Sequence, residues 1–101
     1  MKRRTVRFTA TAQRHVRREQ RWWIENRVHA DVFAAELEVA MRTAAVLPGS
    51  GSAYDKAGVA GLRRVYLPRV VCHLYYTFTD DEVIIRALWG ARRERGPNVK
   101  P

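Results

Sequence analysis

A proline-, glycine- and serine-rich break at residues 48–52 divides the chain into two halves with different hydrophobic periods. Before the break, apolar residues repeat at intervals of three and four, which is the period of one face of an α-helix. After the break, short runs rich in β-branched and aromatic residues are typical of β-strands. A helix cannot continue through Pro48, because proline has no backbone N–H and its ring clashes with the preceding turn. The sequence therefore predicts helices and sheet that are segregated along the chain, as in the α+β class.

The N-terminal half predicts one short strand and two helices. Residues 5–9 alternate polar and apolar side chains, which indicates a strand. Residues 11–27 follow helical spacing with one narrow apolar stripe, and Thr9 or Thr11 is a suitable N-cap. A second helix is expected over residues 31–47. Because the connection between the two helices is short, they should lie antiparallel as a helical hairpin.

Three strands are expected after the break, at residues 62–67, 70–79 and 82–89. The predicted order is β-α-α-β-β-β, in which the three C-terminal strands form an antiparallel sheet and both helices cover one face of it. The chain should form a single domain over residues 1–101. We expect the arginine-rich tail from about residue 90 to be flexible and largely unpacked.

Positive charge is the main feature of the composition. The chain has 19 Lys and Arg against 10 Asp and Glu, which gives a formal net charge of +9. Such an excess attracts anionic partners, and nucleic acid, an acidic protein and a membrane surface all qualify. A basic surface that only keeps the protein soluble is the alternative.

The cellular compartment follows from what the sequence lacks. No segment approaches the ~20 apolar residues that span a bilayer. Of the anionic partners that the charge allows, we expect a macromolecule and not a membrane. The basic start is not followed by the apolar stretch of a signal peptide. A single cysteine, Cys72, excludes an internal disulfide and suits a reducing compartment. We therefore expect a cytoplasmic protein.

Motifs for metal or nucleotide chemistry are weak. The glycine-serine break lacks the Gly-Lys-Ser/Thr ending of a phosphate-binding loop, and it follows a helix instead of opening one. His15, His29 and Cys72 have no zinc-like spacing. The acidic residues 80–82 fall at a hairpin tip, where neighbouring carboxylates point to different faces. We expect no metal and no cofactor.

A basic and aromatic sheet face is the first candidate site. By strand alternation, His73 and Tyr75 point away from the helices, and Arg86 on the last strand can join them. Arg63 and Arg64 point to opposite faces of their strand, and the pattern does not say which of them joins. A solvated sheet face without a ligand is the alternative. The core-facing sides of the last two strands should carry Val70, Cys72, Leu74, Tyr76, Phe78, Val83, Ile85, Ala87 and Trp89.

Further candidate residues lie on the first helix and after the last strand. Trp23 continues the apolar stripe of the helix, so Trp22, about 100 degrees away, is the exposed candidate for an interface. A broad stripe that holds both tryptophans is the alternative. Arg92 and Arg93 add charge just past the last strand. The predicted target-binding set is therefore Trp22, Arg63, Arg64, Tyr75, Arg86, Arg92 and Arg93.

Several short motifs together resemble the RelE/ParE toxin superfamily. The first is Val6-Arg-Phe-Thr-Ala-Thr-Ala12, and Gly61-Leu-Arg-Arg follows the helical hairpin and the break. The longest is Cys72-His-Leu-Tyr-Tyr-Thr-Phe-Thr-Asp-Asp-Glu-Val-Ile-Ile-Arg-Ala-Leu-Trp-Gly-Ala-Arg-Arg-Glu-Arg-Gly-Pro97. The resemblance extends over residues 6–97.

This resemblance implies the toxin of a type II toxin–antitoxin system, neutralised by a cognate antitoxin. It also implies that a flexible segment of the antitoxin wraps the toxin, and it allows a higher-order toxin–antitoxin assembly. From the basic charge of this chain we expect the antitoxin to be acidic and partly disordered. RelE-like members of the superfamily are ribosome-dependent mRNA endoribonucleases, whereas ParE-like members inhibit DNA gyrase without being nucleases.

The choice between these two targets depends on the catalytic residues that the resemblance implies. His73 and Arg92 match positions where ribonuclease members carry basic catalytic residues. No tyrosine follows Arg93, however, and Leu67 and Pro68 occupy the region where lysines are often seen. RNA cleavage needs a base, an acid and charge stabilisation, so this set is incomplete. We therefore favour a gyrase inhibitor, with a ribosome-dependent mRNA endoribonuclease as the alternative. A non-toxic nucleic-acid-binding module is a third hypothesis, suggested by charge alone.

Overall fold

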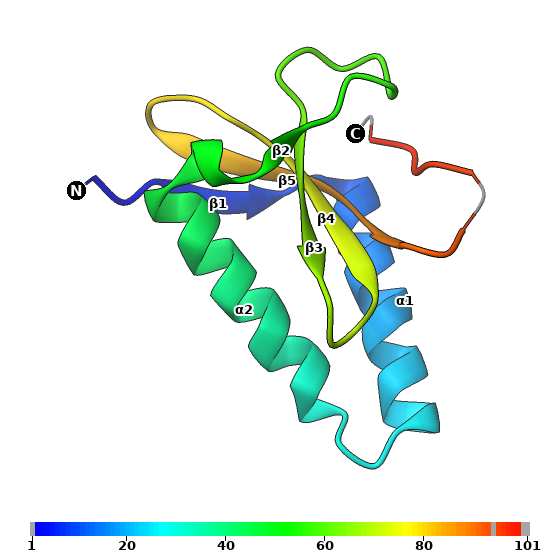
Figure 1. Cartoon of the computed structure of the whole chain (residues 1–101). Coiled ribbons are helices and arrows are strands. Elements are labelled where there is room, and N and C mark those ends of the chain that lie inside the picture. The colour runs from blue at the N-terminus through cyan, green and yellow to red at the C-terminus, as the bar shows by residue number, and fades with distance from the viewer. Residues whose placement is uncertain (1, 94, 100–101) are drawn as a thin grey trace.

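The helical and strand-rich halves of the chain form two layers in the computed structural model, which describes residues 2–93 and 95–99. Both helices cover one face of a five-stranded sheet (Figure 1), which confirms the α+β prediction. The elements, in chain order, are β1 (Thr5–Phe8), α1 (Ala10–Asn26), α2 (Asp31–Val46), the 3-10 turn η1 (Pro48–Ser50), β2 (Ser52–Ala53), β3 (Arg63–Leu67), β4 (Cys72–Phe78) and β5 (Glu82–Gly90).

The sheet is mixed, with the strand order β1-β5-β4-β3-β2. Strands β3, β4 and β5 pair antiparallel, as the sequence predicts. The N-terminal strand β1 pairs parallel to β5, with Thr5 opposite Glu82. The two-residue strand β2 was not predicted, because Ser52 and Ala53 are too few to show an alternating pattern. The sheet therefore has two more strands than the three-stranded sheet predicted for the C-terminal half.

Local signals place the ends of the helices. The hydroxyl of Thr9 accepts a hydrogen bond from the backbone N–H of Ala12 at 3.1 Å, which confirms Thr9 as the N-cap of α1. Helix α2 begins at Asp31, whose carboxylate lies in the first turn, where the helix dipole favours a negative charge. The two helices run in opposite directions and diverge from their short connection (Figure 1). The predicted helical hairpin is confirmed.

The break after α2 is held against the sheet by one tyrosine. The hydroxyl of Tyr76 donates to the carbonyl oxygen of Pro48 at 2.6 Å and accepts from the backbone N–H of Gly51 at 3.0 Å. A Cβ atom on Gly51 would overlap the Tyr76 hydroxyl, so this close approach requires glycine. The Arg63 guanidinium also donates to the carbonyl oxygen of Gly51, at 2.6 Å. The break is therefore a fixed connection.

A register shift in β5 changes which residues face the helices. Tyr75 pairs with Ala87 but Tyr76 pairs with Ile85, so Arg86 is an extra residue in β5. Beyond this bulge Leu88 enters the core, while Ala87 and Trp89 lie on the opposite face. The prediction that Ala87 and Trp89 share the core-facing side with Val83 is wrong, because simple alternation does not anticipate a bulge.

The face of the sheet opposite the helices is covered in part. Leu62, Tyr75, Ala87 and Val99 form a second buried cluster there. Tyr75 is 3% exposed and Val99 is 2% exposed, and the indole N–H of Trp89 donates to the carbonyl oxygen of Arg95 at 2.6 Å. The predictions of an uncovered face and an unpacked tail are therefore wrong at these positions, because the C-terminal segment folds back over Tyr75.

We expect Leu37→Ala to destabilise the fold by about 2–5 kcal/mol, because Leu37 is buried between α2 and the sheet and the shorter side chain leaves a cavity. Chemical unfolding monitored by circular dichroism measures this change. Val39→Ala, at an exposed position of the same helix, is the matched control and should stay within about 0.5 kcal/mol of wild type. Equal effects of the two substitutions would contradict the assigned helix face.

Candidate functional site

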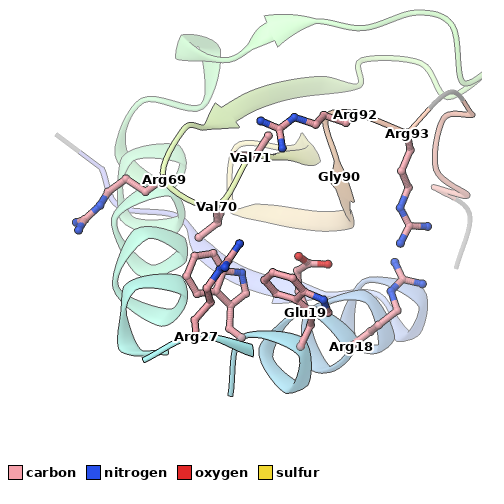
Figure 2. A pocket seen from close by; sticks show the side chains of 11 residues that line it. Arg18, Glu19, Arg27, Arg69, Val70, Val71, Gly90, Arg92 and Arg93 are labelled. Carbon is pink, nitrogen blue, oxygen red and sulfur yellow. The ribbon is translucent and has the colours of Figure 1, made fainter. Parts of the chain in front are cut away.

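An arginine-lined cleft lies where the C-terminal part of α1 faces the β3–β4 turn and the end of β5 (Figure 2). Its volume is about 490 Å³, which lies within the usual range of ligand sites. The lining residues come from three separate parts of the chain. They are Arg18, Glu19, Trp22, Trp23 and Arg27 of the helical half, Arg69, Val70 and Val71 of the turn, and Gly90, Arg92 and Arg93 at the end of β5.

Three local features of the backbone bring these segments together. The backbone N–H of Ala91 donates to the carbonyl oxygen of Val71 at 2.9 Å, which joins the end of β5 to the β3–β4 turn. Val71 has a positive φ of 55°, a conformation that tightens this turn. The turn is also fixed to α2, because a carboxylate oxygen of Glu36 accepts from the backbone N–H of Arg69 at 3.1 Å. The turn at Arg69 and the segment at Arg92 thereby line the same cleft, and Figure 2 shows the Arg69 side chain directed outward past α2.

Stacking on tryptophan orders three of the cleft arginines. The guanidinium of Arg27 lies over the ring of Trp22, 4.9 Å from its centroid. Arg93 lies 4.2 Å and Arg18 5.2 Å from the centroid of the Trp89 ring. A guanidinium held over an aromatic ring by cation–π attraction can still donate hydrogen bonds to other partners. The cleft therefore presents ordered hydrogen-bond donors.

The acidic residue in the cleft does not neutralise these arginines. The carboxylate of Glu19 accepts a hydrogen bond from the Cys72 thiol at 3.7 Å. Within residues 2–93 and 95–99, the arginine side chains that line the cleft form no ion pair with a carboxylate. The cleft is therefore strongly positive, a property suited to an anionic ligand or partner surface.

The buried groups beside the cleft respond to burial and to this charge. Burial, together with the charges of Arg18, Arg14 and Arg93, lowers the pKa of His15 to about 4. Burial and the neighbouring Glu19 carboxylate raise the pKa of the Cys72 thiol to about 12. Cys72 is therefore a thiol at neutral pH and not a nucleophile.

The predicted sheet-face residues form a second group, apart from the cleft. The Arg64 guanidinium donates to the Tyr75 hydroxyl at 3.4 Å and lies 4.7 Å from the centroid of the Tyr54 ring, so Arg64 is the arginine that joins this face. The His73 ring lies between Tyr66 and Tyr75, at centroid distances of 5.2 and 6.2 Å. Burial and the charge of Arg64 lower the pKa of His73, so its imidazole is neutral at neutral pH.

The remaining predicted residues are distributed over the molecule. Arg63 binds the carbonyl oxygens of the glycine break, and Arg86 donates to the Thr77 hydroxyl at 2.9 Å. Trp22 is 43% exposed and lines the cleft, as do Arg92 and Arg93. The structure thus brings three of the predicted target-binding residues together. In the described residues no contact joins His73 to Arg92, the pair considered for RNA cleavage.

Sequence analysis missed Arg18, Arg27 and Arg69 as members of this site. One signal was present, because Arg18 precedes Trp22 by four residues and therefore lies on the same helix face. Arg69 gave no local signal, because its approach to α1 depends on how the β3–β4 turn packs. In the described part of the chain no group of three His, Cys, Asp or Glu could hold a metal ion. None of the described helices is long and apolar enough to cross a membrane.

Comparison with known proteins shows a likeness of fold. No protein-family model matches the chain, and no curated protein matches it. Among solved structures, the fold is similar to a chain from the chromosomal ParDE TA (toxin–antitoxin) system of P. aeruginosa, with a TM-score of 0.68 and 11% sequence identity. The similarity covers 88% of this chain and 97% of the other. At this identity the likeness concerns the fold, which is that of a ParDE-system chain.

We expect His15 to make the fold sensitive to acid. Its Nδ1 atom accepts a hydrogen bond from the backbone N–H of Leu88 at 3.3 Å, which requires the neutral ring. Because its folded pKa of about 4 is below the ordinary value of 6.5, the unfolded chain binds a proton there that the folded chain does not. The free energy of unfolding should therefore decrease as the pH is lowered from 6.5 to about 4.

The test is the free energy of unfolding measured across this pH window. His15→Asn keeps an acceptor oxygen near the Nδ1 position but cannot titrate, so its curve should be flatter than that of wild type. His29→Asn, at an exposed position, is the control and should keep the wild-type slope. The assignment of the effect to His15 is wrong if His15→Asn and wild type lose stability in parallel.

Proposed function

We propose that this protein is the toxin of a type II toxin–antitoxin pair and that it inhibits growth by binding DNA gyrase. The fold likeness to a ParDE-system chain over 88% of the sequence is the observation that carries the proposal. The resemblance of short motifs at residues 6–97 to the RelE/ParE superfamily is consistent with it.

Binding accounts for the arrangement of side chains better than RNA cleavage does. A ribonuclease needs a base, an acid and charge stabilisation around one phosphate. His73 is neutral and could accept a proton, but its ring neighbours are Tyr66 and the buried Tyr75. Arg92 lies in the cleft and makes no contact with His73 in the described residues. The groups for cleavage are therefore not gathered at one point.

A protein target needs a shaped and charged surface. Tryptophan and arginine are the residue types that most often dominate protein interfaces. Trp22, Arg92 and Arg93 lie together in the cleft, and Arg18, Arg27 and Arg69 extend the same positive surface. We assign the main contact with gyrase to this cleft.

The antitoxin is proposed to be acidic and partly disordered, and to order on the toxin surface. A net charge of +9 favours an acidic partner. An apolar groove of about 230 Å³ between α2 and β3 offers a place for hydrophobic anchors, with Val39, Ala40, Val65, Tyr66 and Pro68 among its lining residues. Val39 and Tyr66 are about half exposed in the isolated chain. The toxin and the antitoxin are also proposed to form a higher-order assembly.

The purified protein should inhibit gyrase-dependent DNA supercoiling and leave ribosome-bound mRNA uncut. Arg92→Ala combined with Arg93→Ala removes two cleft cations and should weaken inhibition by about 30-fold, the equivalent of one interface hot spot. His73→Ala should have little effect on supercoiling inhibition, because His73 lies outside the cleft. Supercoiling and mRNA cleavage assays measure both activities.

Arg3→Ala combined with Arg42→Ala is the matched control, since it removes the same charge at a separate cavity near the N-terminus. It should inhibit supercoiling like wild type. Codon-specific cleavage of mRNA on purified ribosomes, lost by about 10²–10⁴-fold in His73→Ala, would instead identify an endoribonuclease with His73 as general base.

Association with the antitoxin should slow as the salt concentration rises. Charge steering acts on the encounter and is screened by ions, whereas apolar anchors in the groove keep the formed complex together. Stopped-flow mixing at a series of salt concentrations gives the association rate, and dilution of the complex gives the dissociation rate. Association rates that do not change with salt would rule out electrostatic recruitment.

A further inference from the structure

The arginines of the cleft differ from most other arginines in how their N–H groups are used. Elsewhere, arginine side chains donate to oxygen atoms of the protein, as Arg4, Arg63 and Arg86 do. The side chains of the five cleft arginines donate no hydrogen bond to any residue in 2–93 or 95–99. These five are Arg18, Arg27, Arg69, Arg92 and Arg93. Each guanidinium carries five N–H donors, so the cleft holds many donors that have no partner among the described residues.

A further unused donor lines the same cleft. The indole Nε1 of Trp23 is buried and has no hydrogen-bond partner in the described part of the chain. A buried donor without a partner costs free energy, and because Nε1 is closed to solvent, a ligand oxygen in the cleft would reach it only after a shift of the Trp23 ring. The lowered pKa of His15, to which Arg18 and Arg93 contribute, is consistent with a positive potential beside this cleft.

We propose that the arginine cleft binds the phosphate backbone of a nucleic acid. A carboxylate presents two oxygens in a plane, which a single guanidinium can satisfy as a bidentate pair. The cleft instead spreads several guanidinium groups over its walls: Figure 2 shows those of Arg18 and Arg93 facing each other, Arg92 apart from them after β5, and Arg69 directed outward past α2. Neighbouring phosphate groups offer the closely spaced charges and several acceptor directions that such an arrangement requires.

The positive surface also continues beyond the cleft, which favours a polymer over a single nucleotide. Arg14, Arg17 and Arg21 are exposed on α1, the helix that supplies Arg18 to the cleft. A chain of phosphates that passes through the cleft can extend along these residues. Binding of this kind reads charge and not base sequence. Direct binding of this protein to nucleic acid does not depend on the proposed inhibition of gyrase, and the two can be tested separately.

The test is fluorescence anisotropy of a labelled single-stranded oligonucleotide titrated with the whole protein at several salt concentrations. If all five arginines contact phosphates, the slope of log K against log salt should be about −3.5, at about 0.7 per contact. Affinity should then fall by roughly 10²-fold between about 50 and 200 mM salt. Arg69→Gln combined with Arg92→Gln should reduce the slope to about −2.1.

Arg69 and Arg92 are suited to this test because both are exposed and neither stacks on a tryptophan, so the fold should be retained. Thermal unfolding followed by circular dichroism measures whether the double variant keeps the wild-type fold. Arg3→Gln combined with Arg42→Gln removes the same charge outside the cleft and should keep a slope close to that of wild type. Polyglutamate and a nucleoside triphosphate serve as competitors, and neither should displace the oligonucleotide at matched charge concentration.

Three results would overturn the proposal. The first is an equal decrease of the salt-dependence slope in Arg69→Gln/Arg92→Gln and in Arg3→Gln/Arg42→Gln, which would indicate binding by net charge alone. The second is displacement by polyglutamate that depends on Arg69 and Arg92, which would identify a site for an acidic protein. The third is binding of the nucleoside triphosphate without binding of the oligonucleotide. Supercoiling inhibition is measured separately, so failure here is distinguishable from failure of the gyrase proposal.

Discussion

The extra residue in β5 at Arg86 is the constraint on which both the core and the candidate site depend. With strict alternation, Trp89 would turn toward the helices and Leu88 away from them. With the bulge, Leu88 enters the core at 1% exposure and Trp89 lies on the opposite face. The Trp89 ring still reaches α1, where it contacts His15 and Arg18, and it also lies beneath the guanidinium of Arg93. One irregular position thus couples the packing of the sheet to the construction of the arginine cleft.

The cleft concentrates positive charge that the fold itself does not neutralise. Its arginines are ordered by tryptophan rings, while the nearby Glu19 carboxylate is bound to the Cys72 thiol. Stacking fixes the guanidinium groups without using their N–H edges, so little further ordering is needed when an anion binds. The same geometry serves both proposals, because gyrase works on DNA and a surface that contacts it can meet protein and phosphate together.

The cleft and the apolar groove meet at the β3–β4 turn. Glu36 lines the groove, and its carboxylate accepts the backbone N–H of Arg69, which lines the cleft. An occupant of the groove would therefore lie within one residue of the cleft. The proposed function requires two surfaces, one for a target and one for an antitoxin, and the cleft and the groove share this short turn.

The sequence was sufficient to predict both helices and the three antiparallel strands, and it narrowed the N-cap of α1 to Thr9 or Thr11. These features follow from periodicity and from local hydrogen bonding, which act over a few residues. The parallel pairing of β1, the bulge at Arg86, the burial of Tyr75 beneath the C-terminal segment and the joining of the β3–β4 turn to α1 in one cleft became evident only in the tertiary structure. Each of these depends on contacts between residues far apart in the chain, and such contacts leave no periodic signal at either partner.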